Sequence, residues 1–552
     1  MSEKVIIAIA QLNPVVGDFE GNRKKILEHY QDAAKGGADL VAFTELTITG
    51  YAPEDLVLRP RFQQDSLEVT YSLAAATKDY KAAILVGGLS IKDGNLYNSV
   101  FLLENGEIKH IFSKYDLPNY GVFDEKRVFA AANLPQAVTW RGIRLGVIIC
   151  EDTWNLDVAR SLAAQKIELL LSLNASPYEI GKKGKRLERT RSNVVITKTP
   201  LIYTNQVCGQ DDVVYDGGSL VLDHEGFIVT QLPHWKEAIQ LTEWEKQSDG
   251  KWHCMTHAMA RTPSKEENIY QAMILSLRDY VAKNGFPGVI LGLSGGIDSA
   301  LTAAVAVDAL GKERVWCVLM PSEFTSQESM DDAAYVAVAL GVKYDIIPIT
   351  PMFEAYKSAL AQPFAGKKED VTEENLQSRI RGGLLMALSN KFGYMVLSTG
   401  NKSEMATGYA TLYGDMCGGY NVLKDTYKTE VYKLSRWRNE HLPERGFGPK
   451  GKVISENIIV KAPTAELRHD QKDQDSLPPY DILDNILYQL VELRKSGDDL
   501  IESGYDKDIV HKVVKLLYQA EYKRRQSAPG TKITTMQFGR DRRYPITHKY
   551  TY

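Results

Sequence analysis

Short runs of apolar residues alternate with helix-like segments along the first half of the chain. Residues 22–34 have helical periodicity, and hairpins are predicted around Asn105-Gly106 and around residues 223–226. Asn-Gly favours a hairpin because both residues tolerate positive φ. Buried strands are predicted at residues 5–10, 40–43, 82–86, 145–149 and 169–173. This mixture predicts a layered α/β domain over residues 1–242.

The second half of the chain alternates more regularly. Residues 243–262 are predicted to be a linker, because the segment EWEKQSDGK at 243–251 is polar and lacks periodicity. A helix is predicted to begin near Ser264, where Ser264 and Glu267 offer a capping box. Strands are expected at 289–293, 315–320, 344–349 and 395–397, with helices at 299–310 and 330–340. The pattern predicts a doubly wound parallel sheet in a domain covering 263–552, with its site at the carboxyl ends of the strands.

Composition is that of an ordinary water-soluble protein. A chain of 552 residues is too long for one hydrophobic core, so two or three domains are expected. The formal net charge of −4 gives no support to nucleic-acid or membrane binding. We therefore expect no nucleic acid and no membrane among the partners, and anionic ligands would need local sites.

The five cysteines are odd in number and widely spaced, and no Cys-x-x-Cys pair occurs. This pattern argues against a disulfide framework or a structural zinc site, and it favours a reducing, cytoplasmic location. The first residues are expected to form a strand and not a signal peptide, and no apolar stretch approaches transmembrane length.

Three residues next to predicted strands and a predicted hairpin suggest amide chemistry. Glu45 follows strand 40–43, Lys114 follows the hairpin, and Cys150 follows strand 145–149. Each alone has a bland alternative: a buried small hydrophobe for the cysteine and a solvated surface charge for the other two. Together they supply a nucleophile, a base for its proton, and a cation for both the thiolate and the oxyanion.

In order and context, these residues resemble the Glu-Lys-Cys triad of the nitrilase superfamily. The resemblance covers the N-terminal half and implies an αββα sandwich. It assigns catalysis to Glu45, Lys114 and Cys150, with Glu125 as a supporting carboxylate. In the glutamine-using branch of the superfamily, it implies that glutamine is bound by Tyr120, Ser176 and Lys182, together with Glu125. Lys183 and Lys185 lie close enough in sequence to compete with Lys182 for this role.

A second motif lies between a predicted strand and a predicted helix. Its glycines allow the backbone to approach an anion closely, and the helix that follows offers free N–H groups. Asp298 is placed to hold Mg²⁺ beside the phosphates. A Gly-rich turn can also be a plain connection, but the complete S-G-G-x-D-S string makes this reading less favourable. The segment consists of Gly292, Leu293, Ser294, Gly295, Gly296, Ile297, Asp298 and Ser299.

No other glycine motif in the sequence indicates a nucleotide-binding site. No G-x-x-x-x-G-K-[ST] string occurs, so the loop is not a Walker A motif. The string GFGPKG at 446–451 matches a bare G-x-G-x-x-G, but no strand precedes it and Pro449 disfavours a helix start. We interpret it as a connecting loop.

The S-G-G-x-D-S loop resembles the ATP pyrophosphatase family, whose members cleave ATP between the α- and β-phosphates and activate an oxygen as its adenylate. Further strings at 374–381, 397–404, 413–415, 463–467 and 522–525 are similar to those of NAD synthetases. That resemblance implies an ATP contact for Thr399, Mg²⁺ binding by Asp298 and Glu404, and deamido-NAD contacts for Asn375, Glu404, Lys424 and Lys523. Arg379 and Arg381 are available as anion or structural partners. An alternative for residues 523–525 is a solvated helix face.

Both halves together resemble the glutamine-dependent NAD synthetases. The resemblance implies a homo-oligomeric ligase whose substrates are glutamine, ATP and deamido-NAD and whose cofactor is Mg²⁺. It also implies an internal channel for ammonia. Residues 463–479 are expected to form a lid, because a reactive adenylate must be shielded from water. One rival is an amidotransferase of the same ATP class with another acceptor, which the strings at 375–381 and 399–404 disfavour. The other is a catalytically inactive binding protein, which has no need of both residue sets.

Overall fold

The computed structural model describes residues 3–469 and 471–550, and the chain divides into two compact units that meet in sequence between Pro263 and Ser264. Within the described ranges, no helix is both long and apolar enough to cross a membrane.

The first unit contains two seven-stranded sheets. One has the order β15-β14-β1-β2-β3-β4-β5 and the other β16-β13-β12-β9-β8-β7-β6, while β10 and β11 pair separately. The strands are β1 (Lys4–Gln11), β2 (Leu40–Ala42), β3 (Ala83–Lys92), β4 (Asn95–Glu104), β5 (Glu107–Ser113), β6 (Val138–Trp140), β7 (Ile143–Ile149), β8 (Leu169–Asn174), β9 (Leu201–Asn205), β10 (Val207–Gln210), β11 (Val213–Asp216), β12 (Leu220–Leu222), β13 (Ile228–Gln231), β14 (Ala238–Lys246), β15 (Trp252–Cys254) and β16 (Ala258–Met259).

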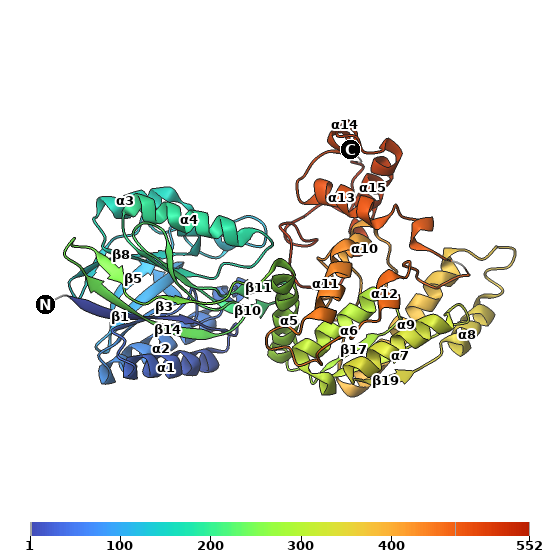
Figure 1. Cartoon of the computed structure of the whole chain (residues 1–552), viewed down its shortest axis with the longest axis horizontal. Coiled ribbons are helices and arrows are strands. Elements are labelled where there is room, and N and C mark those ends of the chain that lie inside the picture. Colours follow the sequence, from blue (N-terminus) through green and yellow to red (C-terminus); the bar gives the residue numbers. More distant parts are fainter. Residues whose placement is uncertain (1–2, 470, 551–552) are drawn as a thin grey trace. The chain divides into compact units, whose positions relative to one another are not determined.

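Helices cover the outer faces of these two sheets. Figure 1 shows α1 and α2 on one side of the strands and α3 and α4 on the other. The helices are α1 (Phe19–Lys35), α2 (Pro60–Ala76), α3 (Leu156–Ala164) and α4 (Lys182–Thr197), with short 3₁₀ helices η1 (Glu54–Leu58), η2 (Thr77–Asp79), η3 (Glu125–Arg127) and η4 (Cys150–Trp154). The predicted αββα sandwich is confirmed.

Burial on both faces explains the continuous apolar runs of the central strands. Ile7 and Ile9 pack between the sheets with Val147 and Ile149, whereas Ala8 and Ala10 face the helical layer. Because successive side chains of a strand point to opposite faces, a strand covered on both sides must be apolar at every position.

The prediction of a linker at 243–262 is wrong. β14 runs antiparallel along β1 and then pairs with β15. Trp244 is fully buried, while its neighbour Glu243 is exposed. The segment is polar because this hairpin alternates between a buried and a solvated side, and its turn includes Gly250 with φ +77°.

The second unit has a four-stranded parallel sheet with the order β19-β18-β17-β20. Its strands are β17 (Val289–Gly292), β18 (Val315–Leu319), β19 (Lys343–Ile346) and β20 (Met395–Val396). The helices are α5 (Lys265–Lys283), α6 (Ile297–Leu310), α7 (Gln327–Leu340), α8 (Thr350–Leu360), α9 (Val371–Phe392), α10 (Lys402–Thr407), α11 (Lys428–Glu440), α12 (Glu456–Val460), α13 (Tyr480–Val491), α14 (Gly497–Glu502), α15 (Lys507–Gln519) and α16 (Glu521–Arg524), with 3₁₀ helices η5 (Lys312–Arg314) and η6 (Asp473–Asp475).

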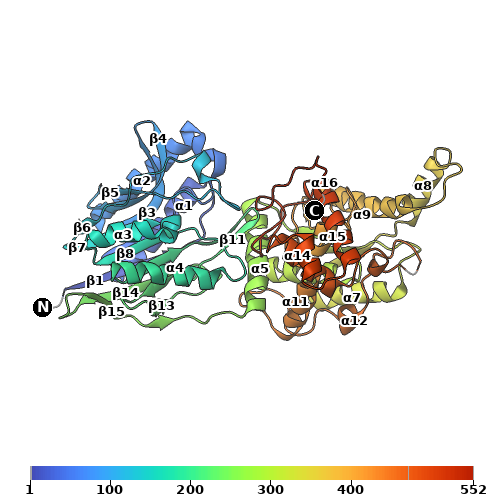
Figure 2. The same cartoon turned by 90° about the horizontal axis from the view of Figure 1, so that it is seen from above.

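The helices of this unit fall into two groups. α6, α7 and α9 contact the strands of the sheet, which completes the predicted doubly wound arrangement. α13, α14 and α15 pack on one another as a helical cluster (Figure 1), and α16 adjoins α15 (Figure 2). The predicted helix start at Ser264 is confirmed, because its hydroxyl accepts the N–H of Glu267 at 3.1 Å.

Candidate active sites

The first candidate site is a buried cluster of charges between strand ends of the first unit. The ammonium of Lys114 lies 2.7 Å from Oε1 of Glu45 and 2.9 Å from both oxygens of Glu125. Glu45 follows β2, Lys114 follows β5, and Glu125 begins η3. Lys114 and Glu45 have no solvent exposure. The fold therefore brings together residues that lie as far as 80 positions apart in sequence, and it isolates them from water.

Neighbouring groups fix both carboxylates. The side-chain amide of Asn98 donates to Oε1 of Glu45 at 2.8 Å, and the backbone N–H of Ala175 donates to Oε2 at 2.9 Å. The hydroxyl of Tyr51 donates to Glu125 at 2.7 Å. Each carboxylate thus has a defined orientation before any substrate arrives.

Cys150 lies where β7 ends and η4 begins. Its φ of 46° is in the left-handed region, which costs a residue with a side chain about 1 to 2 kcal/mol. The turn is held by Asp152, whose carboxylate accepts the N–H of Ile149 at 3.0 Å. Backbone strain kept at such a position is typical of functional residues.

Charge and burial keep the thiol of Cys150 protonated at rest. Burial raises its pKa well above the ordinary value, the negative charge of Glu45 raises it further, and the positive charge of Lys114 opposes both. Burial alone would lower the pKa of Lys114, but Glu125 and Glu45 outweigh it and raise that pKa well above the usual range. A protonated thiol beside a permanent cation needs a base during attack, and Glu45 is the carboxylate whose charge acts most strongly on Cys150.

The residues expected to bind glutamine lie in two environments. Tyr120 is exposed, and its hydroxyl donates to the carboxylate of Glu151 at 3.0 Å. Ser176 is buried, with its N–H bonded to Oδ1 of Asn205 at 2.8 Å. The ammonium of Lys182 lies 5.8 Å from the ring centre of Phe123.

Sequence reasoning missed Glu151. Its charge raises the pKa of Cys150, and the charge of Lys182 acts on Glu151 in turn. Nothing in a single sequence marks Glu151, because its partner Tyr120 is 31 residues away. Of the competing lysines, Lys183 bonds to Thr262 at 3.2 Å and Lys185 is exposed.

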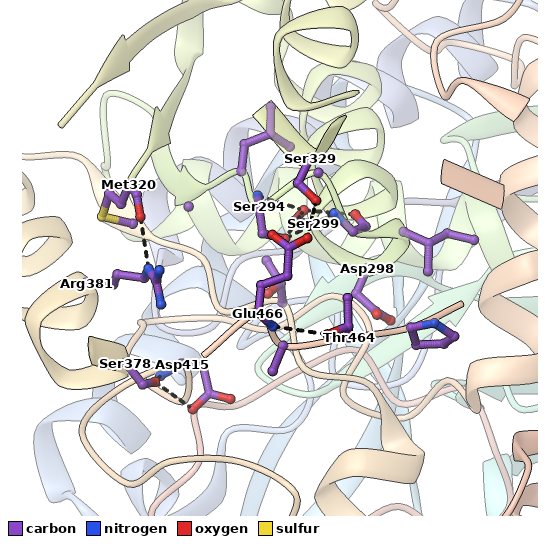
Figure 3. Close-up of a pocket in the computed structure, with 18 of the residues that line it drawn as sticks. Ser294, Asp298, Ser299, Met320, Ser329, Ser378, Arg381, Asp415, Thr464 and Glu466 are labelled. Atoms are coloured by element: carbon purple, nitrogen blue, oxygen red, sulfur yellow. Dashed lines mark hydrogen bonds between the residues drawn. The ribbon is translucent and has the colours of Figure 1, made fainter. Parts of the chain in front are cut away.

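The second candidate site is a cavity of about 300 Å³ in the second unit. It lies at the carboxyl ends of β17, β18 and β20, as expected for a parallel sheet. All eight residues 292–299 line it, together with Thr399 and Glu404. Figure 3 shows Ser294, Asp298 and Ser299 converging on the cavity from the loop and the start of α6.

The loop at 294–299 has the shape of an anion cradle. Gly295 has φ +83°, and a Cβ there would lie 2.2 Å from the backbone oxygen of Ser329. The Ser294 hydroxyl accepts the N–H of Gly296 at 3.2 Å, and the Ser299 hydroxyl donates to the Gly296 carbonyl at 2.9 Å. The loop then enters the 14-residue helix α6, whose first N–H groups favour a phosphate.

Lys428 was also missed from the sequence, and it joins the two expected metal ligands. Its ammonium pairs with Asp298 and lies 3.8 Å from Glu404. Burial and the charge of Asp298 raise the pKa of Glu404 well above its usual range. Asn401 holds the other oxygen of Asp298 at 3.0 Å.

The donor set in this cavity fits magnesium. Among the described residues there is no cluster of three or more His, Cys, Asp or Glu side chains that would make an all-protein metal cage. Mg²⁺ does not need one, because it is usually held by one or two carboxylates together with substrate phosphates and water. Two such carboxylates line the cavity: Asp298, within the loop at 294–299 (the phosphate loop), and Glu404.

The first part of the segment 463–479, which is expected to form a lid, lines the cavity and is held there by one glutamate. Residues 463–467 line the cavity, and the carboxylate of Glu466 accepts hydroxyl bonds from Ser326 and Ser329, both at 2.8 Å. Figure 3 shows Glu466 and Thr464 facing the phosphate loop. Arg381 also lines the cavity, and it donates to the carbonyl of Met320 at 3.0 Å.

Three of the expected deamido-NAD contacts lie outside the cavity lining. The amide oxygen of Asn375 accepts the hydroxyl of Thr411 at 2.9 Å, and Thr411 does line the cavity. The ammonium of Lys523 donates to the carbonyls of Gly408 and Ala410, and that of Lys424 donates to the carbonyl of Ala528. Their roles in binding stay predictions.

The alternative of a solvated face for residues 523–525 is wrong at Arg524. Arg524 is buried and donates to the carbonyls of Met405 and Ala406. Its guanidinium also bonds to Glu521 at 2.8 Å, so the basic run is partly internal.

Both halves of the chain match known families. Residues 6–253 match the family model for carbon-nitrogen hydrolases, and residues 269–527 match that for NAD synthases. A glutamine-dependent NAD(+) synthetase of Rhodobacter capsulatus is 46% identical over 551 residues, which are 100% of this chain and 99% of that protein. One from Thermotoga maritima is 42% identical, with 99% of each chain covered.

Solved structures agree with these matches. The structure of glutamine-dependent NAD+ synthetase from Acinetobacter baumannii in complex with ADP has a TM-score of 0.79 at 42% identity, covering 99% of this chain and 98% of that one. A glutamine-dependent NAD(+) synthetase from Cytophaga hutchinsonii shares the fold, with a TM-score of 0.83 at 22% identity and the same coverage. The chain therefore belongs to the family of glutamine-dependent NAD(+) synthetases.

Proposed function

We propose that this protein amidates deamido-NAD to NAD, with ATP as the activating substrate and glutamine as the nitrogen donor. The observation that carries the proposal is the coexistence of two complete residue sets. One is the buried Lys114–Glu45 pair beside Cys150 in the first unit, and the other is the phosphate loop with Asp298 and Glu404 in the second. We assign the glutaminase step to the first unit, residues 1–263, and the ligase step to the second unit, residues 264–552.

In the proposed amidase step, Glu45 removes the proton from Sγ of Cys150 as the sulfur attacks the side-chain carbonyl of glutamine. Lys114 stabilises the oxyanion, and Glu45 returns the proton to the departing nitrogen, so that ammonia leaves and a γ-glutamyl thioester remains. Water then attacks the thioester and gives a proton to Glu45; the carbon–sulfur bond breaks, and Glu45 returns that proton to the sulfur, so that glutamate and the free thiol form. Glu125 holds Lys114 in place, since both of its oxygens accept from that ammonium.

Two charged residues near Cys150, Glu151 and Lys182, match the charges of a free amino acid. The carboxylate of Glu151 is suited to the α-ammonium of glutamine, and Lys182 to its α-carboxylate. Tyr120 orients Glu151 through its hydroxyl. Ser176 is the further contact that the family resemblance implies.

In the proposed ligase step, the loop at 294–299 and the start of α6 hold the phosphates of ATP. Asp298 and Glu404 would hold Mg²⁺, which neutralises phosphate charge when it is bound. The nicotinate carboxylate of deamido-NAD attacks the α-phosphate and pyrophosphate leaves; ammonia then attacks the acyl carbon and AMP leaves. Thr399 and Lys428 line this cavity, while Asn375, Lys424 and Lys523 remain the proposed deamido-NAD contacts.

The proposal includes transfer of ammonia inside the protein, because ammonia is protonated and diluted in bulk water. It also includes a homo-oligomer and a cytoplasmic location. The five cysteines support the latter, since all are free thiols, as is usual in a reducing compartment.

The test is an assay of NAD formed from deamido-NAD, ATP and Mg²⁺, with glutamine and ammonium compared at equal pH. We expect NAD, AMP and pyrophosphate in equal amounts with either nitrogen source, and glutamate only with glutamine. Release of pyrophosphate with another carboxylate acceptor but not with deamido-NAD would move the protein to a different amidotransferase class.

A further inference from the structure

Asp152 connects the nucleophile turn to the segment that carries the catalytic lysine. Its side chain is 1% exposed. Oδ2 accepts the N–H of Ile149 at 3.0 Å, and Oδ1 accepts the N–H of Asp116 at 2.8 Å and of Tyr115 at 3.2 Å. A single carboxylate therefore receives three backbone N–H groups from two separate segments.

These two segments are the immediate neighbours of the reacting residues. Ile149 precedes Cys150 and ends β7, which belongs to the second sheet. Tyr115 and Asp116 follow Lys114 directly after β5, which belongs to the first sheet. Asp152 thus spans the junction between the two sheets at the point where Cys150 and Lys114 must meet.

Further hydrogen bonds from neighbouring residues fix the positions of Asp152 and its partners. The hydroxyl of Thr153, the next residue, bonds to Ser172 of β8 at 2.8 Å. The side-chain amide of Asn155, the residue that follows η4, donates to the carboxylate of Asp116 at 3.0 Å, which adds a second connection to the segment after β5. Bonds from N–H groups to an ionised carboxylate are stronger than those between neutral groups.

We propose that Asp152 is a positioning residue for the amidase reaction, fixing the Cys150 thiol relative to the Lys114 ammonium across the two sheets. This inference deepens the proposed function and rests on its amidase half. Misplacement of a reacting group by about 1 Å is sufficient to cost on the order of 100-fold in rate. Asp152 acts through Cys150 and Lys114 and does not itself take part in bond making.

The substitution Asp152→Asn tests this role with almost no change in volume. An amide has one acceptor oxygen and one donor nitrogen, whereas the site presents N–H donors on both sides. The variant can therefore serve either Ile149 or the pair Tyr115 and Asp116, but not both. The hydrogen bonds to one of these two segments must be lost, because the amide nitrogen of the new side chain, a donor, then faces a backbone N–H, which is also a donor.

The experiment measures kcat and KM for glutamine hydrolysis, and NAD formation from ammonium, in the full-length protein. For Asp152→Asn we expect kcat for glutamine to fall by about 100-fold with KM within about threefold. Ammonium-dependent NAD formation should keep its rate, which shows that the second unit is intact. Asp157→Asn, at an exposed position on the following helix, is the matched control and should behave as wild type.

Tryptophan fluorescence completes the test, because Trp140, Trp154, Trp235, Trp244 and Trp252 lie in the first unit and only two of the seven tryptophans lie in the second. An unchanged kcat for glutamine overturns the proposal. An unfolded first unit also overturns it, since Asp152 would then be a stability residue only, and so does a loss confined to KM. Absence of glutamine hydrolysis in the wild type would instead refute the proposed function.

Discussion

The ammonium of Lys428 is paired with the carboxylate of Asp298, so a protein cation lies beside a proposed ligand of Mg²⁺. Burial alone would lower the pKa of Lys428, but the charges of Asp298 and Glu404 raise it above its ordinary value. The lysine therefore stays charged and keeps two partly buried carboxylates compatible with an anionic nucleotide.

Replacement of Lys428 by Met should slow NAD formation by about 100-fold with either nitrogen source, because a cation at the reacting phosphates is lost. Glutamine hydrolysis should be maintained. Steady-state rates with glutamine and with ammonium check this, and Asp298→Ala should behave likewise. The control is Lys433→Met on the same helix, whose side chain is 59% exposed. Normal ammonium-dependent rates in the Lys428 variant would remove this residue from the ligase site.

Cys150→Ala should abolish NAD formation from glutamine and preserve that from ammonium, because the nucleophile serves only the release of ammonia. Both rates are measured on one preparation. Cys254→Ala in the same unit is the control, and it should retain both activities. Loss of both in a folded Cys150 variant would show that the two sites do not divide the reaction as proposed.

Gly295→Ala should remove ATP-dependent activity with either nitrogen source. Its φ is +83°, and the added methyl group would lie 2.2 Å from the backbone oxygen of Ser329, so the phosphate loop must move. ATP binding by calorimetry checks the effect. Gly285→Ala provides a close control, because φ is +74° there and nothing lies within 4 Å of the new Cβ. Equal ATP affinities in the two variants would contradict the proposal that the loop at 294–299 holds the phosphates of ATP.

The stability of the first unit should depend on pH through Asp152. Burial raises the pKa of Asp152 to about 7 from its ordinary 3.8, opposed by the N–H bonds from Asp116 and Ile149 and by the charge of Lys114. Between these values the folded state binds more protons than the unfolded state. This group's contribution to the free energy of unfolding therefore falls as pH rises from about 4 to about 7.

Urea unfolding, followed by tryptophan fluorescence between about pH 4 and about pH 7, measures how the free energy of unfolding changes with pH. Asp152→Asn should flatten this dependence, and Asp157→Asn should leave it unchanged. Glutamine hydrolysis should change in the opposite direction, because only the ionised carboxylate accepts all three N–H groups. A slope in Asp152→Asn equal to that of the wild type would assign the titration to another group.

The sequence predicted the central strands and the phosphate loop because these signals are local, whereas Glu45, Lys114 and Cys150 lie up to 105 positions apart and were grouped by their chemistry and by resemblance to a known family. A strand buried on both faces is apolar at every position, and a phosphate loop needs its glycines and its helix within a few residues. The hairpin at β14 and β15 was mistaken for a linker, since one solvated side removes the continuous apolar run. Lys428 and Glu151 were missed because their partners are 130 and 31 residues away, and only the tertiary fold creates those contacts.

The carboxylate of Glu45 accepts one of its hydrogen bonds from the backbone of Ala175, and that of Asp152 accepts three, each from a backbone N–H group. A main-chain donor is present whatever side chain the residue carries, proline excepted. At positions 115, 149 and 175 the hydrogen bond to a carboxylate therefore sets no requirement on the side chain, although burial in the core keeps Ile149 and Ala175 apolar. Alignments of side chains alone will undercount the residues on which this active site depends.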